Sequence, residues 1–266
     1  MKYISSAQNP QIKELKGLQE KVRKRAEKNQ FVIEGLKELD YAIESGYQIE
    51  QIYVTKTKLS KNTKKLVELM QNKNIQIFEL SDSLFESLCY RSTSEIIGVS
   101  QKKKHKLEDL NLKENPLILI SETPEKPGNI GALARTVDAG RIDALIIIDP
   151  KTDLYNPNVI RSSVGCIFAI PIAISDQDEV FSFLESKKIK IYSATFSQKA
   201  KSYAAEKYTK PSAIAVGSED KGLTKSWLER SENHIFIPMQ GLNDSLNLSV
   251  AAGILLFEAV RQRNIE

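Results

Sequence analysis

Residues 235–266 read IFIPMQGLNDSLNLSVAAGILLFEAVRQRNIE, and this stretch decides how the second half of the chain folds. It opens as a short apolar strand, 235–237, which Pro238 ends because proline cannot donate a hydrogen bond to a neighbouring strand. A polar turn leads into a predicted helix, 248–260, that is apolar on nearly every face. Such a helix is normally buried, and its small residues at 249–253 would let another backbone approach closely. Gly253 costs a helix about 1 kcal/mol relative to alanine, which indicates a packing role.

Two polar residues, Ser245 and Asn247, stand where this helix begins. The first four N–H groups of a helix have no partners within the helix. Either side chain could simply cap these groups, or the polar mouth of a buried helix could form a ligand site. The stretch by itself favours neither interpretation, and both remain open.

The rest of the second half predicts a parallel sheet covered on both faces, because its strands are apolar runs without polar alternation. The predicted strands are 117–120, 144–148, 167–174, 189–194 and 213–216. The predicted helices between them are 130–139, 157–164, 178–186 and 225–230. Ligands of open α/β sheets gather at the carboxyl ends of the strands. The loops that follow these strands are therefore the candidate sites.

The first half predicts a small α/β domain, since strands and helices alternate there as well. The predicted strands are 31–35, 49–54, 75–78 and 96–100, and the predicted helices are 10–30, 36–45, 61–72 and 82–88. A lysine-rich linker, 106–115, follows. We therefore expect one domain at 1–105 and a second at 116–266.

The composition, with 41% hydrophobic and 27% charged residues over 266 positions, is typical of a soluble globular protein. No run approaches the ~18 apolar residues of a membrane span, and the N-terminus lacks the apolar core of a signal peptide. A cytoplasmic protein is expected. Cys89 and Cys166 lie far apart in the sequence, which fits a reducing compartment. His105 and His234 are isolated, so we expect no metal site.

The charge is unevenly distributed. Residues 1–113 hold 21 Lys and Arg against 15 Asp and Glu, whereas residues 114–266 hold 17 against 19. Basic clusters lie at 21–25 and 102–106. Short basic runs are most often solvated surface, but a basic front half modestly favours a polyanion partner such as RNA or DNA.

Two loops at carboxyl ends of predicted strands carry unusual sequences. The first, PGNIGALARTVDAG at 127–140, offers Asn129 as an N-cap and places Arg135 off the buried stripe of the following helix. Arg135 is either a solvated surface arginine or a ligand contact close to the helix mouth. The spacing of Gly128 and Gly131 does not match the GxGxxG fingerprint, so a dinucleotide site is poorly supported.

The second loop, AVGSEDKGLT at 215–224, contains Gly217 and Gly222, which permit tight turns and close approach of a ligand. It is not a P-loop, because no Gly-Lys-Ser/Thr follows. Glu219 either caps the next helix or faces a ligand.

Together these two loops and IPMQGLNDSLNLSVAAGILLFE, at 237–258, resemble the three signature motifs of the SpoU/TrmH-type RNA 2′-O-ribose methyltransferases of the SPOUT superfamily. Three motifs in the family's order make a specific signal. The words SSAQNPQIKELKGL and FVIEGLKELDYAIESG in the first half resemble the L30e-like substrate-binding domain that precedes many of these enzymes. One departure is Ser218-Glu219-Asp220, where the family commonly has Asn-Glu-Gly.

The resemblance implies an L30e-like α/β domain followed by a SPOUT α/β domain with a parallel sheet and a C-terminal trefoil knot. It implies S-adenosylmethionine as cofactor, an RNA substrate, 23S ribosomal RNA above all, and a homodimer. The implied cofactor-binding residues are Gly217, Ile237, Met239 and Leu246. The implied catalytic residues are Asn129, Arg135, Glu219, Ser245 and Asn247.

In the family Arg135 is often given the role of taking the proton from the 2′-hydroxyl. A guanidinium is effectively never deprotonated in proteins. Our hypothesis is that Arg135 binds phosphate and polarises the hydroxyl. Arg161, in the word RSS at 161–163, is either an RNA contact or part of a structural ion pair. A transfer RNA 2′-O-methyltransferase and a non-catalytic RNA-binding module remain as alternatives.

Overall fold

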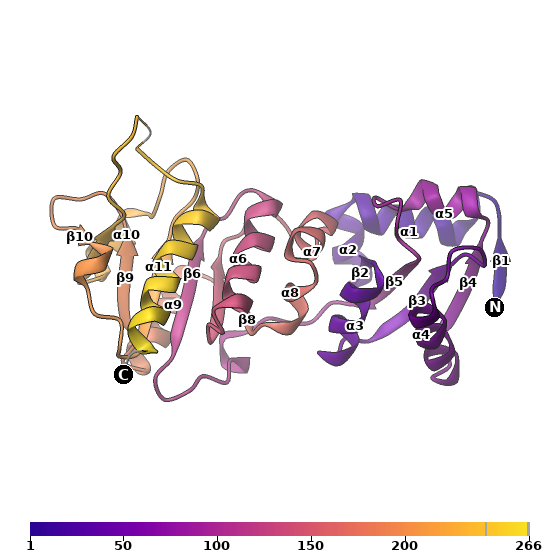
Figure 1. Ribbon diagram of the computed structural model, residues 1–266, viewed down its shortest axis with the longest axis horizontal. Helices are drawn as coiled ribbons and strands as arrows, with labels where there is room; N and C mark the ends of the chain where they lie inside the picture. The colour runs from indigo at the N-terminus through magenta and orange to yellow at the C-terminus, as the bar shows by residue number, and fades with distance from the viewer. Residues whose placement is uncertain (243, 265–266) are drawn as a thin grey trace. The chain divides into compact units, whose positions relative to one another are not determined.

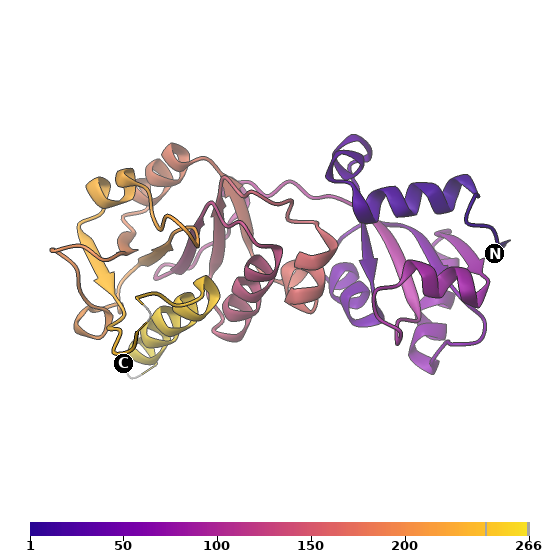
Figure 2. The same ribbon diagram turned by 90° about the horizontal axis from the view of Figure 1, so that it is seen from above.

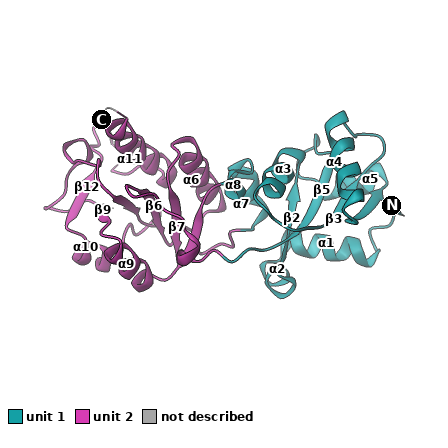
Figure 3. Ribbon diagram, turned by 90° about the horizontal axis from the view of Figure 1, so that it is seen from below, with its two compact units in different colours: residues 1–104, 155–169 teal, residues 105–154, 170–266 magenta. Residues whose placement is uncertain are grey.

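The computed structural model describes residues 1–242 and 244–264 (Figure 1). They form two compact units, coloured separately in Figure 3. The first unit comprises residues 1–104 and 155–169, and the second comprises residues 105–154 and 170–266.

The second unit is built on a parallel sheet. Within the described residues this sheet has seven strands in the order β10-β12-β9-β11-β6-β7-β8, and the neighbouring pairs are parallel. The strands are β6 (Leu117–Glu122), β7 (Ala144–Ile148), β8 (Ile172–Ser175), β9 (Lys190–Ala194), β10 (Lys201–Ser202), β11 (Ser212–Val216) and β12 (Asn233–Phe236). The parallel sheet predicted from the apolar runs is confirmed.

Helices cover both faces of this sheet. Figures 2 and 3 show α6 (Pro127–Ala139) and α11 (Leu248–Arg263) on one face, and α9 (Gln177–Ser186) and α10 (Lys225–Arg230) on the other. Short 3₁₀ turns lie at Leu107–Asp109 and Tyr203–Ala205. Since both faces are covered, β6, β7 and β11 are buried along their whole length. The rigid sheet fixes the loops at its carboxyl edge.

The first unit is a smaller α/β layer structure. Its described strands form a mixed sheet in the order β1-β4-β3-β5-β2, namely β1 (Lys2–Ile4), β2 (Gln30–Glu34), β3 (Ile49–Val54), β4 (Gln76–Leu80) and β5 (Ile96–Gln101). Helices α1 (Pro10–Glu20) and α5 (Asp82–Leu88) share a hydrophobic core on one face. Helices α3 (Leu36–Glu44) and α4 (Lys61–Asn72) lie on the other face (Figure 1).

Two further helices, α7 (Pro157–Ser163) and α8 (Cys166–Ala169), pack in the first unit although they lie between β7 and β8 in the sequence. Aromatic rings hold them there. The ring of Tyr155 lies 4.2 Å from that of Phe31, and the ring of Phe168 lies 5.1 Å from that of Tyr47.

The strand predicted at 167–174 is wrong in its first half. Residues Cys166–Ala169 are helical, and β8 begins only at Ile172. An apolar run of this length does not by itself separate helix from buried strand. Here the packing of Phe168 against Phe31 and Tyr47 stabilises the helical conformation.

The single helix predicted at 10–30 is also wrong, because Lys21 is extended (φ −115°, ψ 112°) and separates α1 from α2 (Val22–Lys28). The buried guanidinium of Arg25 donates to the carbonyl oxygens of Leu18, at 2.8 Å, and Gln19, at 3.3 Å. These bonds satisfy carbonyl groups that the end of α1 leaves without helical partners.

Helix α11 is not buried all round, contrary to the prediction. Val250 is 49% exposed and Phe257 is 47% exposed, while Leu255, Leu256 and Ala259 are buried. A methyl group added at Gly253 would meet Thr136 only at 3.9 Å, which is an ordinary contact. Among the residues that the structure describes, no neighbour therefore requires a glycine at 253. Among the described residues, no helix is long and apolar enough to cross a membrane.

Candidate active site

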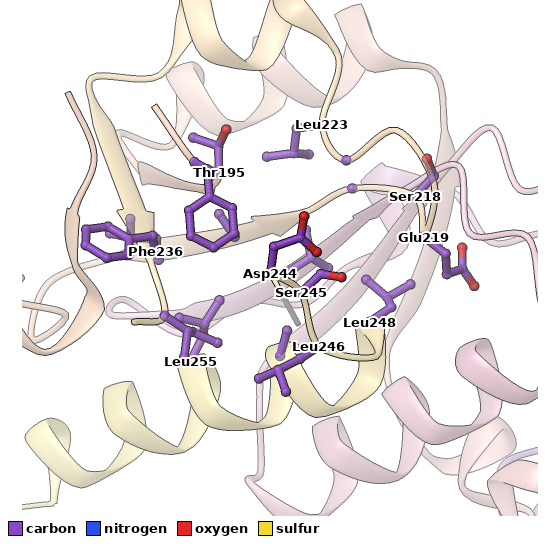
Figure 4. Close-up of a pocket in the computed structure, with 18 of the residues that line it drawn as sticks. Thr195, Ser218, Glu219, Leu223, Phe236, Asp244, Ser245, Leu246, Leu248 and Leu255 are labelled. Carbon is purple, nitrogen blue, oxygen red and sulfur yellow. The ribbon is translucent and has the colours of Figure 1, made fainter. Parts of the chain in front are cut away.

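A cavity of about 910 Å³ lies in the second unit, at the carboxyl ends of β9, β11 and β12 (Figure 4). The loops after these strands and the first turns of α11 form its walls. Figure 4 shows Thr195 and Leu223 on one side, Leu246 and Leu255 on the other, and Asp244 with Ser245 between them. This is the edge of a parallel sheet where ligands are expected.

The loop after β11 folds tightly upon itself. Ser218 N–H donates to the carbonyl of Gly222 at 3.1 Å, and Gly222 N–H donates to the carbonyl of Ser218 at 3.0 Å. A Cβ at Gly217 would lie 1.9 Å from the carbonyl carbon of Gly222 and 2.1 Å from the nitrogen of Leu223. Only glycine fits at 217, because the obstructing atoms belong to the backbone and cannot rotate away.

Glu219 fastens this loop to the start of α6. Its carboxylate accepts hydrogen bonds from the N–H groups of Glu125, at 3.3 Å, and Lys126, at 3.4 Å, and from Nδ2 of Asn129. Partial burial would raise the pKa of Glu219, but these bonds and one from its own N–H outweigh that effect and hold the pKa below its ordinary value. The carboxylate is therefore ionised at neutral pH.

A hydrogen-bonded chain continues from Glu219 through Asn129 to Asn247. Asn247 Nδ2 donates to Oδ1 of Asn129 at 3.1 Å. Asn247 Oδ1 accepts from the N–H and the hydroxyl of Ser249, at 2.9 and 2.7 Å. The prediction that Asn247 could cap α11 is thus confirmed, and the same side chain also joins α11 to α6.

Asn129 is not an N-cap, contrary to the prediction. Helix α6 begins earlier, at Pro127, with Lys126 at the cap position. Asn129 lies in the first turn and is buried. Its amide therefore faces Glu219 and Asn247 instead of the free N–H groups of its own helix.

The other predicted site residues are distributed as follows. Gly217, Ile237, Met239 and Leu246, predicted to bind a cofactor, all line the cavity, as do Glu219 and Ser245. Arg135 does not line it. It is exposed on α6, six residues beyond Asn129 and hence about 9 Å further along the helix axis.

Sequence reasoning missed a second anchor of the β11 loop. The buried carboxylate of Glu122, the last residue of β6, accepts hydrogen bonds from the N–H and hydroxyl of Thr224, at 2.8 and 2.7 Å, and from Nε2 of Gln177 at 3.1 Å. It also missed Thr195 and Phe196, which line the cavity after β9. Their positions at carboxyl ends of parallel strands were the available signal.

In the part of the chain that the structure describes, no group of three or more His, Cys, Asp or Glu side chains is arranged to hold a metal ion.

A covered parallel sheet, with a cavity and a polar cluster at its carboxyl edge, is typical of an α/β protein that binds an organic ligand. The sequence profile of the SpoU rRNA Methylase family matches residues 116–257, and that of the MRM3-like substrate binding domain matches residues 9–98. The chain belongs to the SpoU rRNA methylase family.

Relatives are similar over almost the whole chain. The 23S rRNA (guanosine(2553)-2'-O)-methyltransferase RlmP of Bacillus subtilis is 29% identical, covering 97% of this chain and 98% of the relative. The crystal structure of an AdoMet-bound rRNA methyltransferase from Sinorhizobium meliloti has a TM-score of 0.89 at 26% identity, over 98% of this chain and 97% of that one. A crystal structure of an RNA 2′-O ribose methyltransferase has a TM-score of 0.84 at 34% identity, over 98% and 99%. These structures share the α/β fold with its parallel sheet.

Proposed function

We propose that the protein is an S-adenosylmethionine-dependent RNA methyltransferase that transfers a methyl group to a ribose 2′-hydroxyl, and that 23S ribosomal RNA is its substrate. The observation that carries this proposal is the hydrogen-bonded chain Glu219–Asn129–Asn247 beside the cavity. It joins three segments far apart in the sequence. The relative from Bacillus subtilis, which matches over nearly its full length, is named for the same reaction on 23S rRNA.

The cavity fits the cofactor in size and chemistry. Ligand pockets range from about 300 to 1,000 Å³ and are mostly apolar with a few polar groups. Leu223, Leu248 and Leu255 provide apolar walls for an adenine ring, while the carboxylates of Glu219 and Asp244 favour a positively charged sulfonium. Gly217, Ile237, Met239 and Leu246 would hold the cofactor. When bound, S-adenosylmethionine supplies the electrophilic methyl group.

The chain's own residues would position the RNA. Glu219 lines the cavity and is joined by hydrogen bonds to Asn129 and through it to Asn247, and Ser245, which also lines the cavity, would orient the ribose. Arg135 lies outside the cavity, so it would bind an RNA phosphate with its planar fork and polarise the 2′-hydroxyl through that phosphate. The hydroxyl proton then leaves to solvent or to a phosphate oxygen, since the guanidinium remains charged.

The reaction is tested by mapping 2′-O-methyl groups in 23S and transfer RNA, with and without the protein. Expected is a new methyl group in 23S rRNA that depends on S-adenosylmethionine. A methyl group found only in transfer RNA would show that transfer RNA, and not 23S rRNA, is the substrate. Lack of cofactor binding in isothermal titration, together with RNA binding, would leave a non-catalytic RNA-binding module.

The role of Arg135 is tested by Arg135→Lys, which keeps the charge but loses the fork. We expect kcat to fall by roughly 10²-fold, the cost typical of losing one positioned donor in the transition state. Arg141→Lys, a change at another exposed arginine just after α6, is the control and should retain the parent rate. An Arg135→Lys variant that turns over at the parent rate would contradict the role.

We also propose a homodimer formed through α11. Val250 and Phe257 are exposed apolar residues of α11 spaced by seven positions, so they lie on one side of the helix, and the exposed Leu246 lies two residues before the helix begins. Exposed apolar residues gathered in this way, here called the α11 stripe, mark an interaction surface. Three expectations remain proposals. They are the C-terminal trefoil knot, which the resemblance implies, the division into an L30e-like domain at 1–105, a linker at 106–115 and a methyltransferase domain at 116–266, and the cytoplasmic location expected from the sequence.

A further inference from the structure

We propose that Tyr90 and Arg161 form a stacking platform on the first unit that binds an unpaired base of the RNA substrate. This inference rests on the proposed function, because it takes the substrate to be RNA.

Tyr90 is an aromatic residue held outside the core. Its side chain is 71% exposed, and the guanidinium carbon of Arg161 lies 3.4 Å from the centre of its ring. The guanidinium covers one face of the ring, and the high exposure leaves the rest open to solvent. Aromatic rings and guanidinium planes are the groups on which proteins stack unpaired RNA bases.

The platform is rigid before any ligand binds. The carboxylate of Glu34, at the end of β2, accepts from the N–H of Tyr90 at 3.0 and 3.1 Å and from the N–H of Arg91 at 2.8 Å. It also accepts from the hydroxyl of Ser94 at 2.5 Å. The loop that carries Tyr90 is thereby tied to the sheet. A side chain ordered in advance costs less entropy when it binds.

Arg91 connects the two halves of the platform. One of its guanidinium nitrogens donates to Oε1 of the buried Glu38 at 2.8 Å, and another donates to the carbonyl of Arg161 at 3.5 Å. The guanidinium of Arg161 itself donates to Oδ1 of Asn158, one turn earlier in α7. Tyr90 and Arg161, 71 positions apart in the sequence, are therefore held face to face.

Charge favours a nucleic acid as the partner. Arg91 is neutralised by Glu38, but Arg161 is paired with an uncharged amide and with the ring, so its positive charge remains available. Residues 1–113, which build most of this unit, carry 21 basic against 15 acidic residues. A base stacked on the open side of the platform would bring its phosphates within reach of this positive field.

The test is fluorescence anisotropy of the full chain with two labelled RNAs, a hairpin with an unpaired loop and the corresponding fully paired duplex. Tyr90→Ala should weaken hairpin binding by roughly 5- to 150-fold, the size of one base–aromatic stack, and leave duplex binding unchanged. Tyr90→Phe keeps the ring and should bind like the parent. Arg161→Lys keeps the positive charge but loses the planar guanidinium group. It should therefore weaken hairpin binding without changing how the binding affinity depends on salt concentration.

Tyr3→Ala is the matched control, since Tyr3 is a 64% exposed tyrosine in the same unit and should have no effect on hairpin binding. A second measurement uses the parent protein with 2-aminopurine in the hairpin loop, whose fluorescence should fall on binding because stacking quenches it. Unchanged fluorescence, equal losses on hairpin and duplex, or a Tyr90→Phe variant as weak as Tyr90→Ala would each overturn the proposal.

Titration of the same variants with S-adenosylmethionine separates the two proposals. If the protein neither binds the cofactor nor methylates RNA, but Tyr90→Ala still weakens hairpin binding, the methyltransferase function fails and the platform stands. If methylation proceeds while Tyr90→Ala binds and reacts like the parent, the platform fails and the function stands.

Discussion

Gly217 is the residue at which the wall of the cavity admits no side chain. Replacement by alanine would place Cβ against the backbone of Gly222 and Leu223, as close as 1.9 Å. We expect Gly217→Ala to lower the free energy of unfolding by about 3 kcal/mol, the upper end for forced overpacking, and to abolish cofactor binding. Chemical denaturation and isothermal titration measure the two effects.

Gly222→Ala is the control for Gly217→Ala in the same loop. A Cβ at Gly222 meets no described atom within 4 Å, so only the left-handed backbone (φ +66°) opposes it, at about 1–2 kcal/mol. Equal losses in the two variants would show that flexibility of the loop matters more than the close approach at Gly217.

Glu219 gives the loop a dependence on pH. Its pKa is lowered in the folded state, so its contribution to stability is complete above its unfolded pKa and is lost as the pH falls through the folded value. We therefore expect the stability difference between the parent and Glu219→Gln to be constant above about pH 5 and to shrink in more acidic solution. Asp220→Asn, which changes the exposed carboxylate next in the chain, should show a smaller change over the same range. A difference that stays constant into strong acid would contradict this reading of the Glu219 contacts.

At the scale of elements, the carboxyl end of β6 fixes the start of α10 through Glu122. The buried carboxylate holds the N–H and hydroxyl of Thr224, which ends the loop along the cavity. Hydrogen bonds to a charged group contribute about 1.5–3 kcal/mol. Glu122→Gln should therefore lower the free energy of unfolding by about 2 kcal/mol and weaken S-adenosylmethionine binding, both measurable on the purified protein.

Gln177→Ala removes the outer bonds from Nε2 to Glu122 and to the hydroxyl of Thr224 but leaves the bonds between those two residues, so we expect a loss of about 1 kcal/mol with cofactor affinity retained. Should Glu122→Gln lose stability without any change in cofactor affinity, the carboxylate would be structural and would not position the loop.

Helices and strands whose conformation depends on neighbouring residues in the sequence could be predicted from it. Strand β7 and helix α10 have the predicted bounds, because one is an uninterrupted apolar run and the other a short helix between turn residues. The strand predicted at 167–174 failed because the contacts of Phe168 with Phe31 and Tyr47 are distant in the chain. Local pattern carries no information on such partners.

The candidate site, like the fold, has parts that the sequence predicts and parts that it does not. Its loops could be located from the sequence, since the carboxyl ends of parallel strands meet at one edge. The pairing of Glu219 with Asn129 and of Glu122 with Thr224 could not, because each joins residues 90 or more positions apart. The cap predicted at Asn129 failed for a related reason. Two groups from other elements hold its amide, and the helix begins two residues before it.

At the scale of the whole molecule, the exposed apolar stripe on α11 predicts assembly. A stable interface buries roughly 800 Å² on each partner, and apolar residues at its centre contribute most of the binding energy. Phe257→Glu places a charge in the proposed interface, where it would be buried without a partner. We expect the parent to sediment as a dimer and Phe257→Glu as a monomer. Leu69→Glu is the matched control, because Leu69 is also 47% exposed but lies on α4 in the other unit, and this variant should remain dimeric.

Since Leu246 belongs to both the stripe and the cavity wall, the monomer should also bind S-adenosylmethionine more weakly than the parent. A Phe257→Glu variant with the mass of the parent dimer would place the interface elsewhere, and a monomer with parent affinity would show that assembly and cofactor binding are independent.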